Sequence, residues 1–100
     1  MSLEIRPDEL QLGSDFLLDV RYEWEHELVR LPDQALIPLP ELADRMSELP
    51  KGVRIVAYCH HGVRSLSAAA ILRNAGFDAV SLQGGIDLWS RLIDPALPRY

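Results

Sequence analysis

The chain has a single cysteine, Cys59, so no disulfide can form within it and its fold does not depend on an oxidising compartment. It has no run of about 18 apolar residues, and its first ten residues carry Glu4, Arg6, Asp8 and Glu9, so we expect neither a membrane span nor a secretory signal. It also lacks a basic block, since ten Lys and Arg face fifteen Asp and Glu, for a net charge of −5. We therefore expect a cytoplasmic location, with neither nucleic acid nor a membrane as partner.

The composition that is present is typical of a folded domain. Hydrophobic residues make up 48% of the chain and charged residues 25%, which is the ordinary balance of a globular protein. One hundred residues is close to the usual size of one domain. Prolines are scattered, and there is neither an internal repeat nor a low-complexity tract. We therefore expect a single domain over residues 1–100.

Short apolar runs predict the strands. The strongest is 53–58, which is rich in β-branched residues and follows the turn-forming 50–52, so we expect a central, mostly buried strand. The segment 16–20 has the same short apolar character, and weaker candidates are 36–37 and 79–82.

Apolar residues at steps of three and four predict helices between the strands. The clearest covers 65–75, with Gly76 as its left-handed stop. Further candidates are 41–49, a helix that follows Gly84 and Gly85, a short helix over 23–28 and a single turn over 7–10. Strands that alternate with helices predict an α/β fold with a parallel sheet covered on both faces.

The chemically active side chains gather at one junction, Tyr58 to Ser65, between the best strand and the best helix. Cys59 would lie at the carboxyl edge of the sheet, where α/β proteins bind ligands. If the chain then curls around the sulfur, backbone N–H groups and the start of the next helix would stabilise an anion there. Gly62 would permit the turn, and Arg64 would add a cation. Both effects favour the thiolate, so we predict that Cys59 is a nucleophile.

Together with this loop, three other segments resemble a single-domain rhodanese, a sulfurtransferase. The four segments are Leu18–Arg21, Ile37–Leu39, Cys59–Ser65 and Leu82–Trp89, and the likeness runs from about Phe16 to Trp89. A lone Cys-x-x-Gly-x-Arg would be a weak signal, but four ordered segments are a strong one. The resemblance implies a three-layer α/β/α sandwich with a five-stranded parallel sheet.

The resemblance also implies a reaction. Cys59 would accept sulfane sulfur from a donor such as thiosulfate, carry it as a persulfide and pass it to a thiophilic acceptor. The expected binding loop is His60, His61, Gly62, Val63, Arg64 and Ser65. Asp19 and Arg21 follow a strand at the same edge and are candidates for a supporting role. Alternatively their role is structural, with Asp19 capping backbone N–H groups and Arg21 pairing with Glu23 or Glu25.

Three other functions stay open at this point. A non-catalytic binding module of the same fold is disfavoured because the cysteine and the arginine are both present. A persulfide relay fed by a protein donor, such as a cysteine desulfurase, cannot be separated from thiosulfate chemistry by sequence. A cysteine-dependent phosphatase or arsenate reductase is less favoured, because only four residues, His60 to Val63, lie between the cysteine and the arginine.

The remaining residues carry structural expectations. His60 and His61 are adjacent and rarely would both reach one ion, so we expect no metal, no cofactor and solvent-facing loop histidines. Trp24 and Trp89 are expected to pack in the core. The stretch Arg30–Ala35 departs from the family's usual sequence, so this loop is expected to be built differently.

Overall fold

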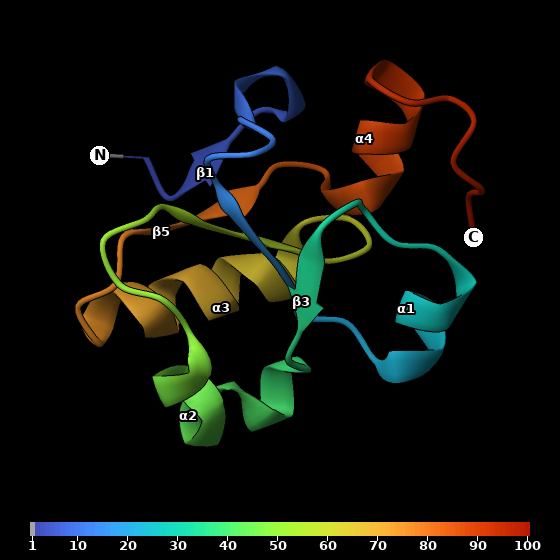
Figure 1. Cartoon of the computed structure of the whole chain (residues 1–100). Helices are drawn as coiled ribbons and strands as arrows, with labels where there is room; N and C mark the ends of the chain where they lie inside the picture. Colours follow the sequence, from blue (N-terminus) through green and yellow to red (C-terminus); the bar gives the residue numbers. More distant parts are fainter. Residues whose placement is uncertain (1) are drawn as a thin grey trace.

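The computed structural model describes residues 2–100 and contains a five-stranded, all-parallel sheet (Figure 1). The sheet order is β1-β5-β4-β2-β3. The strands are β1 (Glu4–Ile5), β2 (Phe16–Asp19), β3 (Gln34–Leu36), β4 (Ile55–Tyr58) and β5 (Ala79–Leu82). The helices are α1 (Glu23–Leu28), α2 (Leu42–Arg45), α3 (Val63–Asn74) and α4 (Gly85–Leu92), with 3₁₀ turns at Pro7–Glu9, Leu39–Glu41 and Met46–Glu48. Within this range no helix is long and apolar enough to cross a bilayer.

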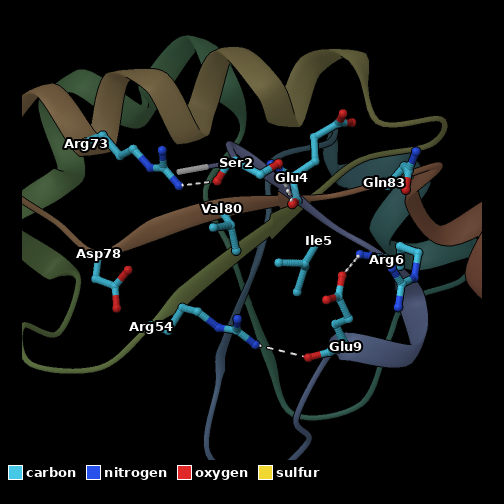
Figure 2. A pocket seen from close by; sticks show the side chains of 10 residues that line it. All are labelled: Ser2, Glu4, Ile5, Arg6, Glu9, Arg54, Arg73, Asp78, Val80 and Gln83. Atoms are coloured by element: carbon cyan, nitrogen blue, oxygen red, sulfur yellow. Dashed lines mark hydrogen bonds between the residues drawn. The ribbon is translucent and has the colours of Figure 1, made fainter.

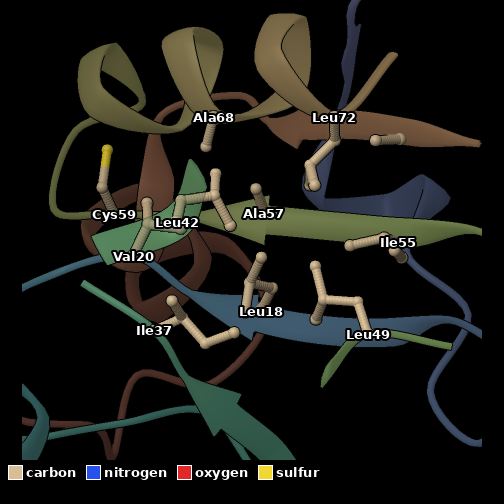
Figure 3. Packing of buried hydrophobic residues seen from close by; sticks show 11 residues of the cluster. Leu18, Val20, Ile37, Leu42, Leu49, Ile55, Ala57, Cys59, Ala68 and Leu72 are labelled. Carbon is tan, nitrogen blue, oxygen red and sulfur yellow. The ribbon is translucent and has the colours of Figure 1, made fainter. Parts of the chain in front are cut away.

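The side chains of β4 alternate between two hydrophobic clusters, one on each face of the sheet. Ile55, Ala57 and Cys59 pack with residues of α2 and α3, as Figure 3 shows. Val56 and Tyr58 pack on the opposite face with residues of α4. Because both faces are covered, β4 is fully buried, as expected for a central parallel strand. The prediction of a three-layer α/β/α sandwich with a five-stranded parallel sheet is confirmed.

Several expected boundaries were wrong. The helix expected over 41–49 is only the four-residue α2 between two 3₁₀ turns, because the backbone at Arg45 leaves the helical region at φ −118°. Strand β3 ends at Leu36 instead of continuing through Ile37. Strand β1 was not expected, since two residues at a sheet edge carry no periodic signal.

The carboxyl ends of β2 and β4 meet at the point where the chain reverses its direction through the sheet. From β2 the chain moves outward to β3, then crosses back to β4 and continues to β5. Asp19, the last residue of β2, pairs with Tyr58, the last residue of β4. In open parallel sheets, ligands bind at such switch points. Cys59 follows directly after Tyr58 at this point.

A buried ion pair lies beneath the switch point. Asp19 and Arg21 are both fully buried, and Arg21 Nε and Nη2 donate to the Asp19 carboxylate at 2.9 and 2.8 Å. Arg21 also donates to the Val29 carbonyl at 2.6 Å and to the Tyr100 hydroxyl at 3.0 Å. The Tyr58 hydroxyl donates to Asp19 at 3.2 Å. The pair thereby joins β2, β4, the residue after α1 and Tyr100.

We predict that Arg21→Met lowers the free energy of unfolding by about 3–5 kcal/mol, because the Asp19 carboxylate would stay buried without its cation. Urea unfolding at neutral pH measures the loss. Arg99→Met is the matched control, since Arg99 pairs with Asp87 at the surface and is 54% exposed; its loss should be much smaller than that of Arg21→Met. Equal losses in the two variants would contradict a structural role for the buried pair.

Candidate functional site

The sulfur of Cys59 lies inside the loop that joins β4 to α3. Cys59 is 1% exposed, and its Sγ accepts hydrogen bonds from the backbone N–H of Gly62 at 3.1 Å and of Ser65 at 3.4 Å. The Ser65 hydroxyl lies 3.4 Å from the sulfur and 2.7 Å from the hydroxyl of Ser81 on β5. The loop therefore curls around the sulfur and directs N–H dipoles at it, an arrangement that stabilises negative charge.

Gly62 makes this turn possible. Its φ of +98° lies in the left-handed region, which a residue with a Cβ rarely adopts. A Cβ at this position would also lie 3.0 Å from the backbone nitrogen of Gly84. The chain enters α3 immediately afterwards, so the positive end of that helix faces the same loop.

The start of α4 holds the outer side of the loop. The N–H groups of Ile86 and Asp87 donate to the carbonyls of Cys59 and His60 at 2.9 and 3.1 Å. These two bonds fix the first two peptide planes of the loop against α4. Gly85 lies between the two segments, and a Cβ there would overlap the carbonyl oxygens of both Cys59 and His60.

Arg64 is held in an ion pair. Its two terminal nitrogens donate to the two carboxylate oxygens of Glu25 at 2.7 and 2.9 Å. This pairing raises the pKa of Arg64, so the guanidinium stays charged. The guanidinium carbon of Arg64 lies 5.9 Å from the centre of the Tyr22 ring. The charge of Arg64 is thus compensated by Glu25, on α1.

Glu25 is 3% exposed, and its state is set by its neighbours. Burial alone would raise its pKa, but hydrogen bonds from Arg64 and from the Tyr100 hydroxyl outweigh burial and lower the pKa to about 2. Glu25 is therefore a carboxylate at neutral pH. It connects α1, the Cys59 loop and Tyr100.

The two loop histidines differ from one another. His61 is exposed, and its Nδ1 lies 3.9 Å from an oxygen of Asp87. The His60 ring lies against the His61 ring at 3.9 Å and against the Tyr100 ring at 3.8 Å, the latter almost parallel at 7°. Burial and the neighbouring His61 lower the pKa of His60. The expectation of a solvent-facing histidine is therefore wrong for His60.

Other expected site residues lie apart from the sulfur. Val63 is 74% exposed. Asp19 and Arg21 are buried beneath the site and reach it through Tyr100, which bonds to both Arg21 and Glu25. The expected pairing of Arg21 with Glu23 or Glu25 was wrong. Arg21 pairs with Asp19, whose carboxylate also accepts the backbone N–H of Arg21 at 2.9 Å. Trp89 packs in the core, whereas Trp24 is 59% exposed, so the expectation for Trp24 was wrong.

Sequence reasoning missed Glu25, Ser81 and Tyr100 as neighbours of the loop. Glu25 could have been found from its place on a short helix that follows a strand ending at the same sheet edge as Cys59. Ser81 is the polar exception within an otherwise apolar strand. Tyr100 lies 75 residues from Glu25 in the chain and gives no local signal.

A cavity of about 540 Å³ lies elsewhere, along the β1 edge of the sheet (Figure 2). None of its ten lining residues belongs to the Cys59 loop. Its three arginines are already engaged: Arg6 pairs with Asp8, Arg54 pairs with Asp15, and Arg73 donates to backbone carbonyls. Within residues 2–100, no three His, Cys, Asp or Glu side chains are grouped to hold a metal ion.

The chain is similar to a family of known domains and to proteins named as sulfurtransferases. The family model described as Rhodanese-like domain matches residues 6–92. The chain is 38% identical over 74 residues to the thiosulfate sulfurtransferase GlpE of Pseudomonas syringae, covering 73% of this chain and 70% of GlpE. It is 40% identical over 87 residues to the probable adenylyltransferase/sulfurtransferase MoeZ of Mycobacterium tuberculosis, covering 84% of this chain but only 22% of MoeZ.

The fold has solved counterparts. The crystal structure of a rhodanese-related protein from Thermoplasma volcanium superposes with a TM-score of 0.85 at 28% identity, covering 95% of this chain and 94% of that one. The sheet and its helices are therefore shared over nearly the whole length of both chains.

We predict that Gly85→Ala lowers the free energy of unfolding by about 2 kcal/mol more than Gly13→Ala, because only the former drives a Cβ into the Cys59 loop. Both glycines have positive φ, +62° and +90°, so both variants carry backbone strain, but Gly13 has no neighbour within 4 Å of the added Cβ. Urea unfolding of the two variants makes the comparison. Equal losses would show that α4 does not press against the loop.

A pH titration tests Glu25. Because its pKa is lowered from 4.5 to about 2 in the folded chain, its stabilisation is present above about pH 4.5 and is lost as the pH falls toward 2. We expect Glu25→Gln to cost about 2–3 kcal/mol of unfolding free energy at pH 7. The difference in unfolding free energy between the variant and the original chain should narrow below pH 4.5. Glu27→Gln, at an exposed position of the same helix, is the control and should lose much less stability at pH 7 than Glu25→Gln. A gap that stays constant down to pH 2 would contradict the pairing.

Proposed function

The chain belongs to the family of rhodanese-like domains, and we propose that it is a sulfurtransferase that carries sulfane sulfur as a persulfide on Cys59. The observation that carries this proposal is the position of the Cys59 sulfur, which accepts hydrogen bonds from the N–H groups of Gly62 and Ser65 inside the loop. A persulfide is an anion, as a thiolate is, so the same N–H groups suit both states of the cysteine. We further propose that residues 1–100 act as one such domain.

The proposed reaction has two half-reactions. The Cys59 thiolate attacks the outer sulfur of thiosulfate, the S–S bond of the donor breaks, and sulfite leaves with the bonding electron pair. A thiophilic acceptor such as cyanide then attacks the outer sulfur of the persulfide, takes that sulfur as thiocyanate and returns Cys59 to the thiolate. Because the enzyme carries the sulfur between the two steps, the kinetics should be ping-pong.

In this mechanism the binding loop works mainly through its backbone. Gly62 and Ser65 supply N–H donors, and His60, His61 and Val63 form the rest of the loop. Arg64 is paired with Glu25, so its role is to fix the loop against α1 while it contributes a compensated charge. Asp19 and Arg21 act from beneath, by fixing the end of β2 and the segment after α1.

A protein donor or acceptor is the second candidate. Three apolar or aromatic side chains close to the loop are exposed: Tyr22, Trp24 and Val63. Exposed side chains of this kind favour contact with a protein surface over binding of a small anion. The similarity to one fifth of MoeZ, a larger protein named as a sulfurtransferase, supports this alternative.

We predict that the purified chain gains one sulfur atom in intact-protein mass spectrometry after treatment with thiosulfate, and loses it again on addition of cyanide. Cys59→Ser should show no gain, because a hydroxyl does not form a persulfide, and its melting temperature should stay within a few degrees of the original. Protein whose Cys59 was first blocked with iodoacetamide provides a control with unchanged sequence.

The outcomes separate the two candidates. A gain of sulfur by Cys59→Ser would remove Cys59 from the mechanism. No gain in the original chain would remove thiosulfate as donor, and treatment with a persulfidated cysteine desulfurase would then test for a protein-fed relay.

A further inference from the structure

Residues 93–100 lie beyond the family match, which ends at residue 92, yet they return to the candidate site. Tyr100 makes the contact. Its hydroxyl donates to Glu25 at 2.5 Å and accepts from Arg21 at 3.0 Å. Burial and the Glu25 carboxylate raise the pKa of Tyr100 to about 12, so the hydroxyl keeps its proton at neutral pH.

The ring of Tyr100 spans the gap between α1 and the Cys59 loop. On the loop side it lies parallel to the His60 ring at 3.8 Å. On the α1 side it meets Trp24 edge-on at 5.9 Å. His60 is the residue directly after Cys59, and Glu25 holds Arg64 on the other side of the loop. A reactant that approaches the sulfur between α1 and the loop therefore meets this ring.

The segment that carries Tyr100 is lightly anchored. Most of residues 93–100 are exposed. Besides Tyr100, the segment is held by the N–H groups of Ile93 and Asp94, which donate to the Trp89 carbonyl at 2.8 and 3.2 Å, by the packing of Leu97 against a core cluster and by the pair of Arg99 with Asp87. The closed arrangement also buries Nε2 of His60. Opening breaks both hydroxyl contacts of Tyr100, so the open form is a minor population.

We propose that Tyr100 determines which reactants reach Cys59: small reactants pass beside the ring, and bulky ones require residues 93–100 to move away. For the proposed sulfurtransferase, this makes Tyr100 a specificity-determining residue that disfavours bulky protein thiols until they displace the segment. That consequence rests on the proposed function, whereas the barrier at Cys59 does not.

Alkylation of Cys59 tests the barrier. Iodoacetamide and a fluorescein-linked iodoacetamide share one reactive group and differ in size, and Cys59 is the only thiol in the chain. Rates are measured for the original chain, Tyr100→Ala, Tyr100→Phe and the control Leu92→Ala, which removes an exposed side chain from the end of α4.

We expect Tyr100→Ala to raise the rate with the fluorescein reagent about tenfold and with iodoacetamide no more than about threefold, as when a reactive open form is a minor population. Tyr100→Phe keeps the ring and loses both hydroxyl contacts, so its rate with the fluorescein reagent should lie between the rates of the original chain and Tyr100→Ala. Leu92→Ala should match the original chain.

Equal acceleration of both reagents would overturn the proposal, because global unfolding exposes Cys59 to both alike. An unchanged rate with the fluorescein reagent would overturn it as well. Alkylation needs only a thiol, so failure of the sulfur-transfer experiment would leave this result intact, and the reverse also holds.

Discussion

The buried ion pair between Asp19 and Arg21 is the interaction on which the candidate site depends. Removing two charges from water is costly, and the cost is offset here because the pair is surrounded by further hydrogen bonds. The side chain of Arg21 binds the carbonyl of Val29, just after α1, as well as the Tyr100 hydroxyl. The position of α1 follows from these bonds. Glu25 lies on α1 and holds Arg64, so a pair beneath the sheet edge governs the geometry above it.

In the proposed mechanism, backbone N–H groups would stabilise the sulfur anion, and among residues 2–100 the cations near the loop are compensated or disfavoured. Arg64 is neutralised by Glu25, and burial disfavours a charge on His60. The backbone dipoles of Gly62 and Ser65 remain, and they are fixed in the fold. Salt screens exposed charges far more than groups in direct, buried contact. The stabilisation of a sulfur anion by these dipoles should therefore depend little on ionic strength.

The parts of this structure that could be predicted from sequence are those encoded locally. Residues 59–65 follow an apolar strand and precede a helical repeat, so their position at the sheet edge was readable, and four ordered segments indicated the sheet around them. The Glu25–Arg64 pair joins residues 39 positions apart, and Tyr100 meets His60 from the far end of the chain. Such pairings depend on how elements pack, which periodicity does not describe.

The expected exposure of His60 was wrong for the same reason, a contact between segments that are distant in the chain. A polar residue in a glycine-containing loop is exposed by default, and only the return of residues 93–100 places a ring over it. Arg45 shows the local counterpart: apolar spacing indicated a helix over 41–49, but the spacing says nothing about where the backbone leaves helical angles.

The contact between α4 and the loop has a consequence for protein engineering. The first N–H groups of α4 bind the carbonyls of Cys59 and His60, and Gly85 permits the close approach. The orientation of the first two peptide planes of the loop is therefore fixed by a helix that lies more than 20 residues away in the chain. A transplant of residues 59–65 onto another strand–helix junction would carry the cysteine without its electrostatic setting. The smallest transferable unit is the loop together with β5 and the first turn of α4.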